Sequence, residues 1–256
     1  MTPGRLGEVL GMPPTPQGTW QEEALYVSPA ALRRREAPEE LAARLRALPG
    51  IADVRVRPGG FLEIVVAVPG ELLTEIGTAS PPVPEAGAVP SVSEAGAVPP
   101  VPGDGRSPCR DDGDGSPVPQ AGGVPSWPDF PRTWENPGFA VRYAHVRAVA
   151  VRRWAAELGV GGEFRPELLD GREDRAVLRL LAEVYGRRVS RDPGWAAYAE
   201  QLALAYHDAF ERAPALPVGD EEPTALHTAR VRLARAVRDV LAEALAAIGE
   251  TAPDRL

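Results

Sequence analysis

A proline- and glycine-rich segment divides this 256-residue chain into two parts. Residues 78–131 contain 13 prolines and 8 glycines, with hardly any large apolar side chain before Trp127. The motif EAGAVP occurs at 85–90 and again at 94–99, and the related QAGGVP occurs at 120–125. Such a composition buries too little apolar surface to offset the conformational entropy that folding removes.

We therefore expect residues 78–133 to be a disordered linker that spans roughly 40 Å on average. The alternative is a proline-rich ligand for a small adaptor domain. None of the repeats has a basic residue beside it to fix the orientation of such a ligand, so a plain linker is favoured.

The part before the linker, residues 1–77, has the pattern of a small α+β module. Helices are predicted where apolar residues follow helix-start signals, as in Ser28-Pro29 and Ala37-Pro38. Apolar runs predict two strands, at 51–57 and 61–68, joined by a Pro-Gly-Gly turn. Helices are expected at 4–11, 28–36, 38–48 and from Pro69 onward. Together they would cover a short antiparallel sheet.

The part after the linker, residues 134–256, is predicted to be helical throughout. Its first helix, 136–158, begins with Asn136 as the capping residue and Pro137 in the first turn. Apolar side chains then recur at helical spacing along one face. Further helical segments are expected at 163–169, 172–185, 193–212 and 224–248. Short connections between long amphipathic helices predict an all-α helical bundle.

The formal charge of −8 is unevenly distributed. The N-terminal module has 8 Arg and 10 acidic residues, the segment 78–135 has 3 and 8, and residues 136–256 have 17 and 18. The chain contains no lysine. Bulk positive charge therefore cannot drive nucleic-acid binding, which would have to use a local arginine-bearing face.

Several kinds of chemistry are excluded by residue type. The single cysteine, Cys109, provides neither a disulfide framework nor a metal set, and the three histidines (145, 207 and 227) lack metal-binding spacing. Without lysine there is no Walker-type phosphate loop. We expect no cofactor and no metal. No apolar run approaches the roughly 20 residues that span a bilayer, so we expect no membrane partner. With a single cysteine and no disulfide framework, the reduced cytoplasm is the expected location.

Four stretches carry a family resemblance. NPGFAVRYAHVR at 136–147, AAYAEQLALAYHDAFERAPAL at 196–216 and the segment 227–256 resemble the anticodon-binding, or DALR-type, domain of class I arginyl-tRNA synthetases. Residues 26–67 resemble the N-terminal additional domain of that family. In the family a catalytic domain with HIGH and KMSKS signatures lies between these modules. Neither signature occurs here, so we do not expect this chain to aminoacylate tRNA.

The resemblance implies which residues would contact tRNA. Tyr143 matches the family's Tyr-Ala-His, Phe61 falls in the turn that faces the tRNA elbow, and Leu256 takes a terminal position that is often Met. Unpaired bases are read by stacking on aromatic rings and arginine planes, while arginines also hold phosphates. The candidate RNA-binding residues are Phe61, Arg142, Tyr143, His145, Arg147, Arg232, Arg235, Arg238 and Leu256.

Each candidate also has a purely structural interpretation. Tyr143 is equally well explained as a half-buried core residue, and His145 as a satisfied structural one. Tyr206 and Phe210 are most simply core residues. The arginines of the last helix can form a solvated, salt-bridged face with acids such as Asp239.

Two functional hypotheses remain open. In the first, the chain is a non-catalytic tRNA-binding protein that engages the anticodon and the elbow of a tRNA-Arg-like partner with two tethered modules. In the second, it is a protein-interaction or regulatory module whose partner is a synthetase or another protein. A third, weaker idea is that the chain supplies tRNA-binding ends to a separate catalytic subunit.

Overall fold

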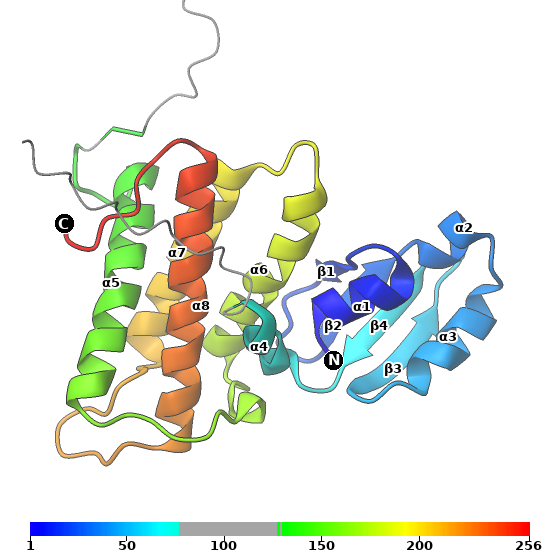
Figure 1. Cartoon of the computed structure of the whole chain (residues 1–256), viewed down its shortest axis with the longest axis horizontal. Helices are drawn as coiled ribbons and strands as arrows, with labels where there is room; N and C mark the ends of the chain where they lie inside the picture. The colour runs from blue at the N-terminus through cyan, green and yellow to red at the C-terminus, as the bar shows by residue number, and fades with distance from the viewer. Residues whose placement is uncertain (77–126, 129) are drawn as a thin grey trace, which may run out of the picture. The chain divides into compact units, whose positions relative to one another are not determined.

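The computed structural model describes residues 1–76, 127–128 and 130–256. Figure 1 traces the chain from its N-terminal helix α1 to the C-terminal tail. Most of the expected linker therefore lies outside the described residues. Its last part, Trp127 and the residues up to 133 apart from 129, is described and leads into the first bundle helix.

The N-terminal module contains a four-stranded antiparallel sheet in the order β1-β2-β4-β3. Its strands are β1 (Thr15–Gln17), β2 (Ala24–Ser28), β3 (Ile51–Val56) and β4 (Leu62–Val66). Every residue of β4 is buried, which explains why this strand is almost continuously apolar. Its first three helices are α1 (Pro3–Leu10), α2 (Ala30–Arg34) and α3 (Pro38–Arg46). The expected α+β class is confirmed.

Two of the four strands were not predicted from the sequence. Tyr26 and Val27 are part of β2. β1 is three residues long and has a proline at its centre, so it carries little strand signal. The predicted turn between β3 and β4 is present. There Gly59 and Gly60 have positive φ angles of 86° and 79°, which suit glycine.

The C-terminal part is a bundle of four long helices, as predicted. They are α5 (Pro137–Glu157), α6 (Arg172–Val189), α7 (Trp195–Arg212) and α8 (Ala225–Ala247), with a short 3-10 turn η2 (Pro166–Leu168) between α5 and α6. Thr224 caps α8, and its backbone N–H in turn donates to the ring of His227. This reciprocal cap fixes where the last helix begins.

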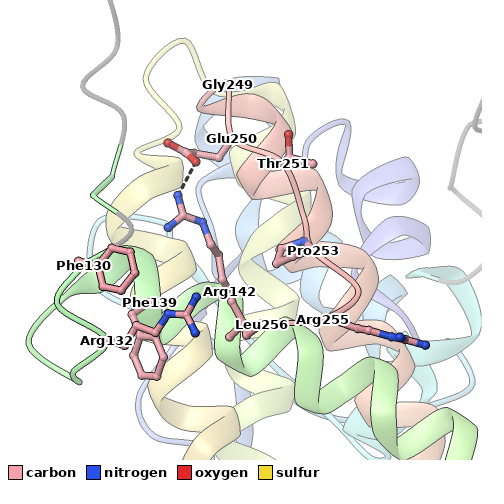
Figure 2. A pocket seen from close by; sticks show the side chains of 10 residues that line it. All are labelled: Phe130, Arg132, Phe139, Arg142, Gly249, Glu250, Thr251, Pro253, Arg255 and Leu256. Carbon is pink, nitrogen blue, oxygen red and sulfur yellow. Dashed lines mark hydrogen bonds and ion pairs between the residues drawn. The ribbon is translucent and has the colours of Figure 1, made fainter.

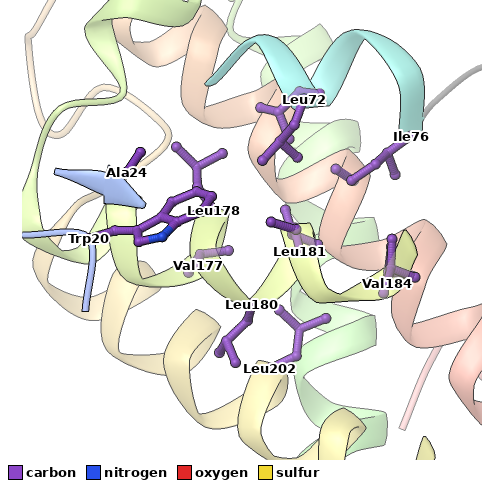
Figure 3. Packing of buried hydrophobic residues seen from close by; sticks show 14 of the residues in the cluster. Trp20, Ala24, Leu72, Ile76, Val177, Leu178, Leu180, Leu181, Val184 and Leu202 are labelled. Atoms are coloured by element: carbon purple, nitrogen blue, oxygen red, sulfur yellow. The ribbon is translucent and has the colours of Figure 1, made fainter. Parts of the chain in front are cut away.

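The two modules share a hydrophobic core. The 3-10 turn η1 (Pro69–Leu72) and α4 (Leu73–Ile76) carry Leu72 and Ile76 into the same cluster as Leu178 and Leu181 of α6. Figure 3 shows these side chains together with Trp20, which is 1% exposed. The sequence predicted two tethered modules. Direct packing of the modules against each other was not predicted, because Trp20 lies in a loop without apolar periodicity.

Three hydrogen bonds accompany this packing. Arg175 Nη1 donates to the carbonyl of Trp20 at 3.1 Å, and Arg179 Nε donates to that of Gly18 at 2.7 Å. The hydroxyl of Tyr185 donates to Glu75 at 2.9 Å. Backbone carbonyls of the β1–β2 loop lose hydrogen bonds to water when the modules pack. The two arginines of α6 provide replacement hydrogen-bond donors.

Candidate nucleic-acid interface

The start of α5 is held by one side chain, that of Asn136. Its Oδ1 accepts the backbone N–H of Gly138 at 3.0 Å, as an N-cap does. Its Nδ2 donates to the carbonyls of Pro128 at 2.9 Å and Pro131 at 2.8 Å. One amide therefore fixes both the first turn of the helix and the loop that precedes it. This confirms the predicted cap.

The C-terminal tail after α8 folds back onto the same end of α5. Arg142 Nη2 and Glu250 Oε2 are 2.6 Å apart, and both side chains are nearly buried. The backbone N–H of Trp127 donates to Glu250 Oε1 at 3.0 Å, and the Trp127 carbonyl accepts from Arg142 at 3.3 Å. A charged pair in a dry setting is most stable when further hydrogen bonds surround it, as they do here.

His145 provides a second attachment for the tail. Its Nδ1 lies 3.0 Å from the carbonyl of Pro253, and the residue is only 4% exposed. Burial lowers the pKa of His145, and the hydrogen bond to Pro253 partly opposes this effect. The ring is therefore held in its neutral form with Nδ1–H as the donor.

A pocket of about 430 Å³ opens between the tail and the start of α5. Its lining residues are Phe130, Arg132, Phe139, Arg142, Gly249, Glu250, Thr251, Pro253, Arg255 and Leu256. In Figure 2 the phenyl rings lie at one end of the pocket and Arg255 at the other, with the Arg142–Glu250 ion pair along the edge. The volume is in the range of small-ligand sites, and aromatic and guanidinium planes suit a flat heterocyclic base.

An aromatic cluster continues from the pocket along α5. Trp134 makes edge-to-face contacts with Phe139 and Tyr143, at centroid distances of 5.9 and 5.5 Å. The ring centroids of Trp134 and of His207 on α7 are 4.2 Å apart. Phe139 lines the pocket as well, so it joins the pocket to the cluster. Trp134 is 41% exposed and keeps free ring surface for stacking.

Arg147 stabilises this cluster. Its guanidinium lies 4.6 Å from the ring centroid of Tyr143 and 4.2 Å from that of Phe210. It also forms an ion pair with Glu211 at 2.8 Å and a hydrogen bond with His207 Nδ1 at 2.9 Å. With its charge matched by Glu211, Arg147 is placed to orient rings rather than to attract phosphate over a distance.

The predicted arginines of α8 are elsewhere on the bundle. Arg232 lies 5.2 Å from the ring centroid of Phe164. Arg235 and Arg238 both pair with Asp239, the former at 4.0 Å. None of the three lines the pocket. Their ion pairs fit the alternative interpretation of a solvated, salt-bridged face.

The structure thus groups only part of the predicted site. Arg142 and Leu256 line the pocket, while Tyr143, Arg147 and His145 surround it through ring contacts and the tail. Phe61 is 40% exposed at the β3–β4 turn of the other module. The aromatic and arginine lining residues that were not predicted from the sequence are Phe130, Arg132, Phe139 and Arg255. Phe130 and Arg132 were assigned to the linker by composition, and an aromatic residue just before a capped helix was the available signal.

Residues 1–76, 127–128 and 130–256 contain no cluster of three or more His, Cys, Asp or Glu side chains placed to hold a metal ion. Within these ranges no helix is long and apolar enough to cross a bilayer.

Comparison with known proteins agrees with this geometry. Residues 141–256, which include most of α5 and the tail, match the DALR anticodon binding domain family. The C-terminal bundle is therefore similar to a DALR anticodon binding domain over this range. The chain is also 44% identical over 132 residues to an arginine–tRNA ligase from Clavibacter sepedonicus. That alignment covers 49% of this chain and 24% of the ligase, so the chain spans about a quarter of this relative.

Proposed function

We propose that this chain binds the anticodon loop of a tRNA, with a tRNA-Arg-like molecule as its partner, and does so without aminoacylating it. The pocket beside Arg142 would receive one unpaired base, and the ring of Trp134 would stack on a neighbouring one. The observation that carries the proposal is the pocket itself. The residues that match the DALR anticodon binding domain form part of its wall, and aromatic and arginine side chains line it.

The non-catalytic part of the proposal rests on the sequence. Neither HIGH nor KMSKS occurs in the 256 residues, and the chain has no lysine. A class I synthetase uses those signatures to bind ATP. The chain therefore has the features of an RNA-reading module without those of an ATP-dependent ligase.

Crosslinking with RNA sequencing tests the proposal directly. The full chain is expressed, irradiated with ultraviolet light in cell extract and purified under denaturing conditions, and the attached RNA is sequenced. We expect tRNA reads with crosslink stops in the anticodon loop, and fewer of them for Phe139→Ala than for Val9→Ala on α1. Crosslinks spread evenly over unrelated RNAs would contradict the proposal.

One observation favours the alternative, a protein-binding module. Arg142, Arg147 and Arg238 are paired with acidic side chains inside the domain, so they contribute little net positive charge to the surface. A protein partner, such as a synthetase, would tolerate this neutral surface. Affinity purification with and without nuclease separates the two functions. A stoichiometric protein that survives nuclease treatment supports the alternative, and loss of all partners supports RNA binding.

A further inference from the structure

The arginines of α5 differ in burial and in pairing along the helix. Near its start, Arg142 and Arg147 are ion-paired with Glu250 and Glu211. Near its end, Arg152 and Arg153 are exposed, and neither has an ion-pair partner among the described residues. Two adjacent unpaired guanidinium groups are therefore available to a partner at this end of the helix.

An exposed aromatic ring lies beside these arginines. Trp154 is 39% exposed, and the guanidinium of Arg153 lies 5.8 Å from its ring centroid. An indole edge and a guanidinium can together contact the sugar–phosphate backbone of a nucleic acid, the ring against the sugar and the cation against the phosphate. Arg152, Arg153 and Trp154 form what we call the α5 basic patch.

Helix geometry relates this patch to the base pocket. Arg142, which lines the pocket, and Arg153 are 11 residues apart on one continuous helix. At 3.6 residues per turn this is just over three turns, so the two positions point to nearly the same side, separated by roughly 16 Å along the axis. Figure 1 shows α5 as an uninterrupted helix over this length.

This separation fits a hairpin rather than a single nucleotide. Phosphates along one strand of a duplex advance along its axis by about 3.4 Å per nucleotide in B-form DNA and by less in an A-form RNA stem, so roughly 16 Å corresponds to about five steps or more. A base held in the pocket would therefore place the backbone on the stem side of the hairpin beside Arg153.

We propose that the α5 basic patch binds the phosphate backbone of the stem of an RNA hairpin whose loop occupies the base pocket. This inference rests on the proposed function, since the pocket sets the position of the hairpin. The contact is independent of stem sequence, because it uses phosphates alone. Glu157, exposed one turn beyond Arg153, opposes binding by repelling the same phosphates.

The test compares a hairpin with its isolated loop. Binding of a fluorescent anticodon stem-loop, and of the loop sequence as a single strand, is measured between 50 and 200 mM salt. The proteins are wild type, the double variant Arg152→Gln with Arg153→Gln, and Glu157→Gln. Arg191→Gln is the matched control, because Arg191 is exposed, lies outside α5 and has no ion pair among the described residues.

We expect the double variant to lose about two phosphate contacts on the hairpin only. Raising the salt from 50 to 200 mM should weaken hairpin binding by wild type by a factor about ten times larger than the factor for the double variant. Glu157→Gln should bind the hairpin more tightly, and Arg191→Gln should behave as wild type. Equal urea midpoints for all variants exclude a folding defect.

The remaining outcomes overturn the inference in distinguishable ways. If wild type binds neither RNA, the proposed function and this inference both fail. If wild type binds the hairpin and the double variant keeps the same salt dependence, the function stands and the patch is not a stem site; a protein partner is then its better explanation. Equal losses on the hairpin and on the single strand would place the arginines at the loop instead, which also contradicts the inference.

Discussion

Arg142 Nη2 lies 2.6 Å from Glu250 Oε2, and this buried ion pair joins the first helix of the domain to a tail residue 108 positions later. The same carboxylate accepts the backbone N–H of Trp127. One side chain therefore connects α5, the segment before it and the tail that forms the opposite wall of the pocket. The shape of the candidate base pocket depends on this pair.

Glu250→Gln should destabilise the domain by about 3 kcal/mol. The substitution removes the negative charge of Glu250 beside the buried guanidinium of Arg142, and the desolvation penalty of that guanidinium is then less fully offset. Urea unfolding followed by circular dichroism measures the change. Glu222→Gln, at an exposed position before α8, is the matched control and should change stability by less than about 0.5 kcal/mol. A loss below about 1 kcal/mol for Glu250→Gln would show that the pair does not hold the tail.

Two buried tyrosines allow a matched comparison. The Tyr206 hydroxyl is buried and has no hydrogen-bond partner among the described residues, whereas the Tyr198 hydroxyl donates to the carbonyl of Leu180 at 3.0 Å. Tyr206→Phe should leave stability unchanged or raise it by up to about 1 kcal/mol. Tyr198→Phe should lower it by about 1 kcal/mol. Equal losses for both variants would indicate that Tyr206 has a partner after all, such as an ordered water.

His145 should make stability depend on pH. Burial lowers its pKa in the folded chain, so near pH 6 the unfolded chain binds more protons and stability rises with pH. The contribution is complete above the ordinary histidine pKa of about 6.5 and is lost as pH falls below it. Urea unfolding at pH 5.5 and 7.5 should show a smaller difference for His145→Gln than for wild type. An identical difference would mean that the ring is not held neutral.

Trp134→Ala should weaken binding of an anticodon stem-loop by about 5- to 100-fold, the range for loss of one base–aromatic stack. Trp134→Phe keeps an aromatic face and should retain most of the affinity. Titrations by fluorescence anisotropy, with the fold checked by circular dichroism, measure both. If the alanine and phenylalanine variants bind alike, the exposed indole face does not stack on RNA.

Much of the fold was predictable because its signals are local. The caps Asn136 and Thr224, the proline at 137 and the apolar periodicity of the helices all act within a few residues, and the bundle follows from them. The β1–β2 pair was missed because its register depends on β4, which lies more than 30 residues away. Pairing with a distant strand produces little detectable pattern in the sequence of a short strand.

The candidate site was less predictable for the same reason. The resemblance indicated α5 and the tail, but the ion pairs that neutralise Arg142 and Arg147 form between distant segments. Their effect is to turn expected phosphate ligands into structural groups. Trp134 was hidden by the composition of the proline-rich segment that it follows, although its ring contacts α5 and α7.

The central claim is that this domain still binds tRNA. The most direct test is a fluorescence anisotropy titration of full-length tRNA-Arg with the whole chain at about 50 mM salt, repeated as salt is raised. Our account predicts saturable binding that weakens steadily with salt and is displaced by an unlabelled anticodon stem-loop. An absence of binding at about 50 mM salt, where phosphate contacts are strongest, would contradict it.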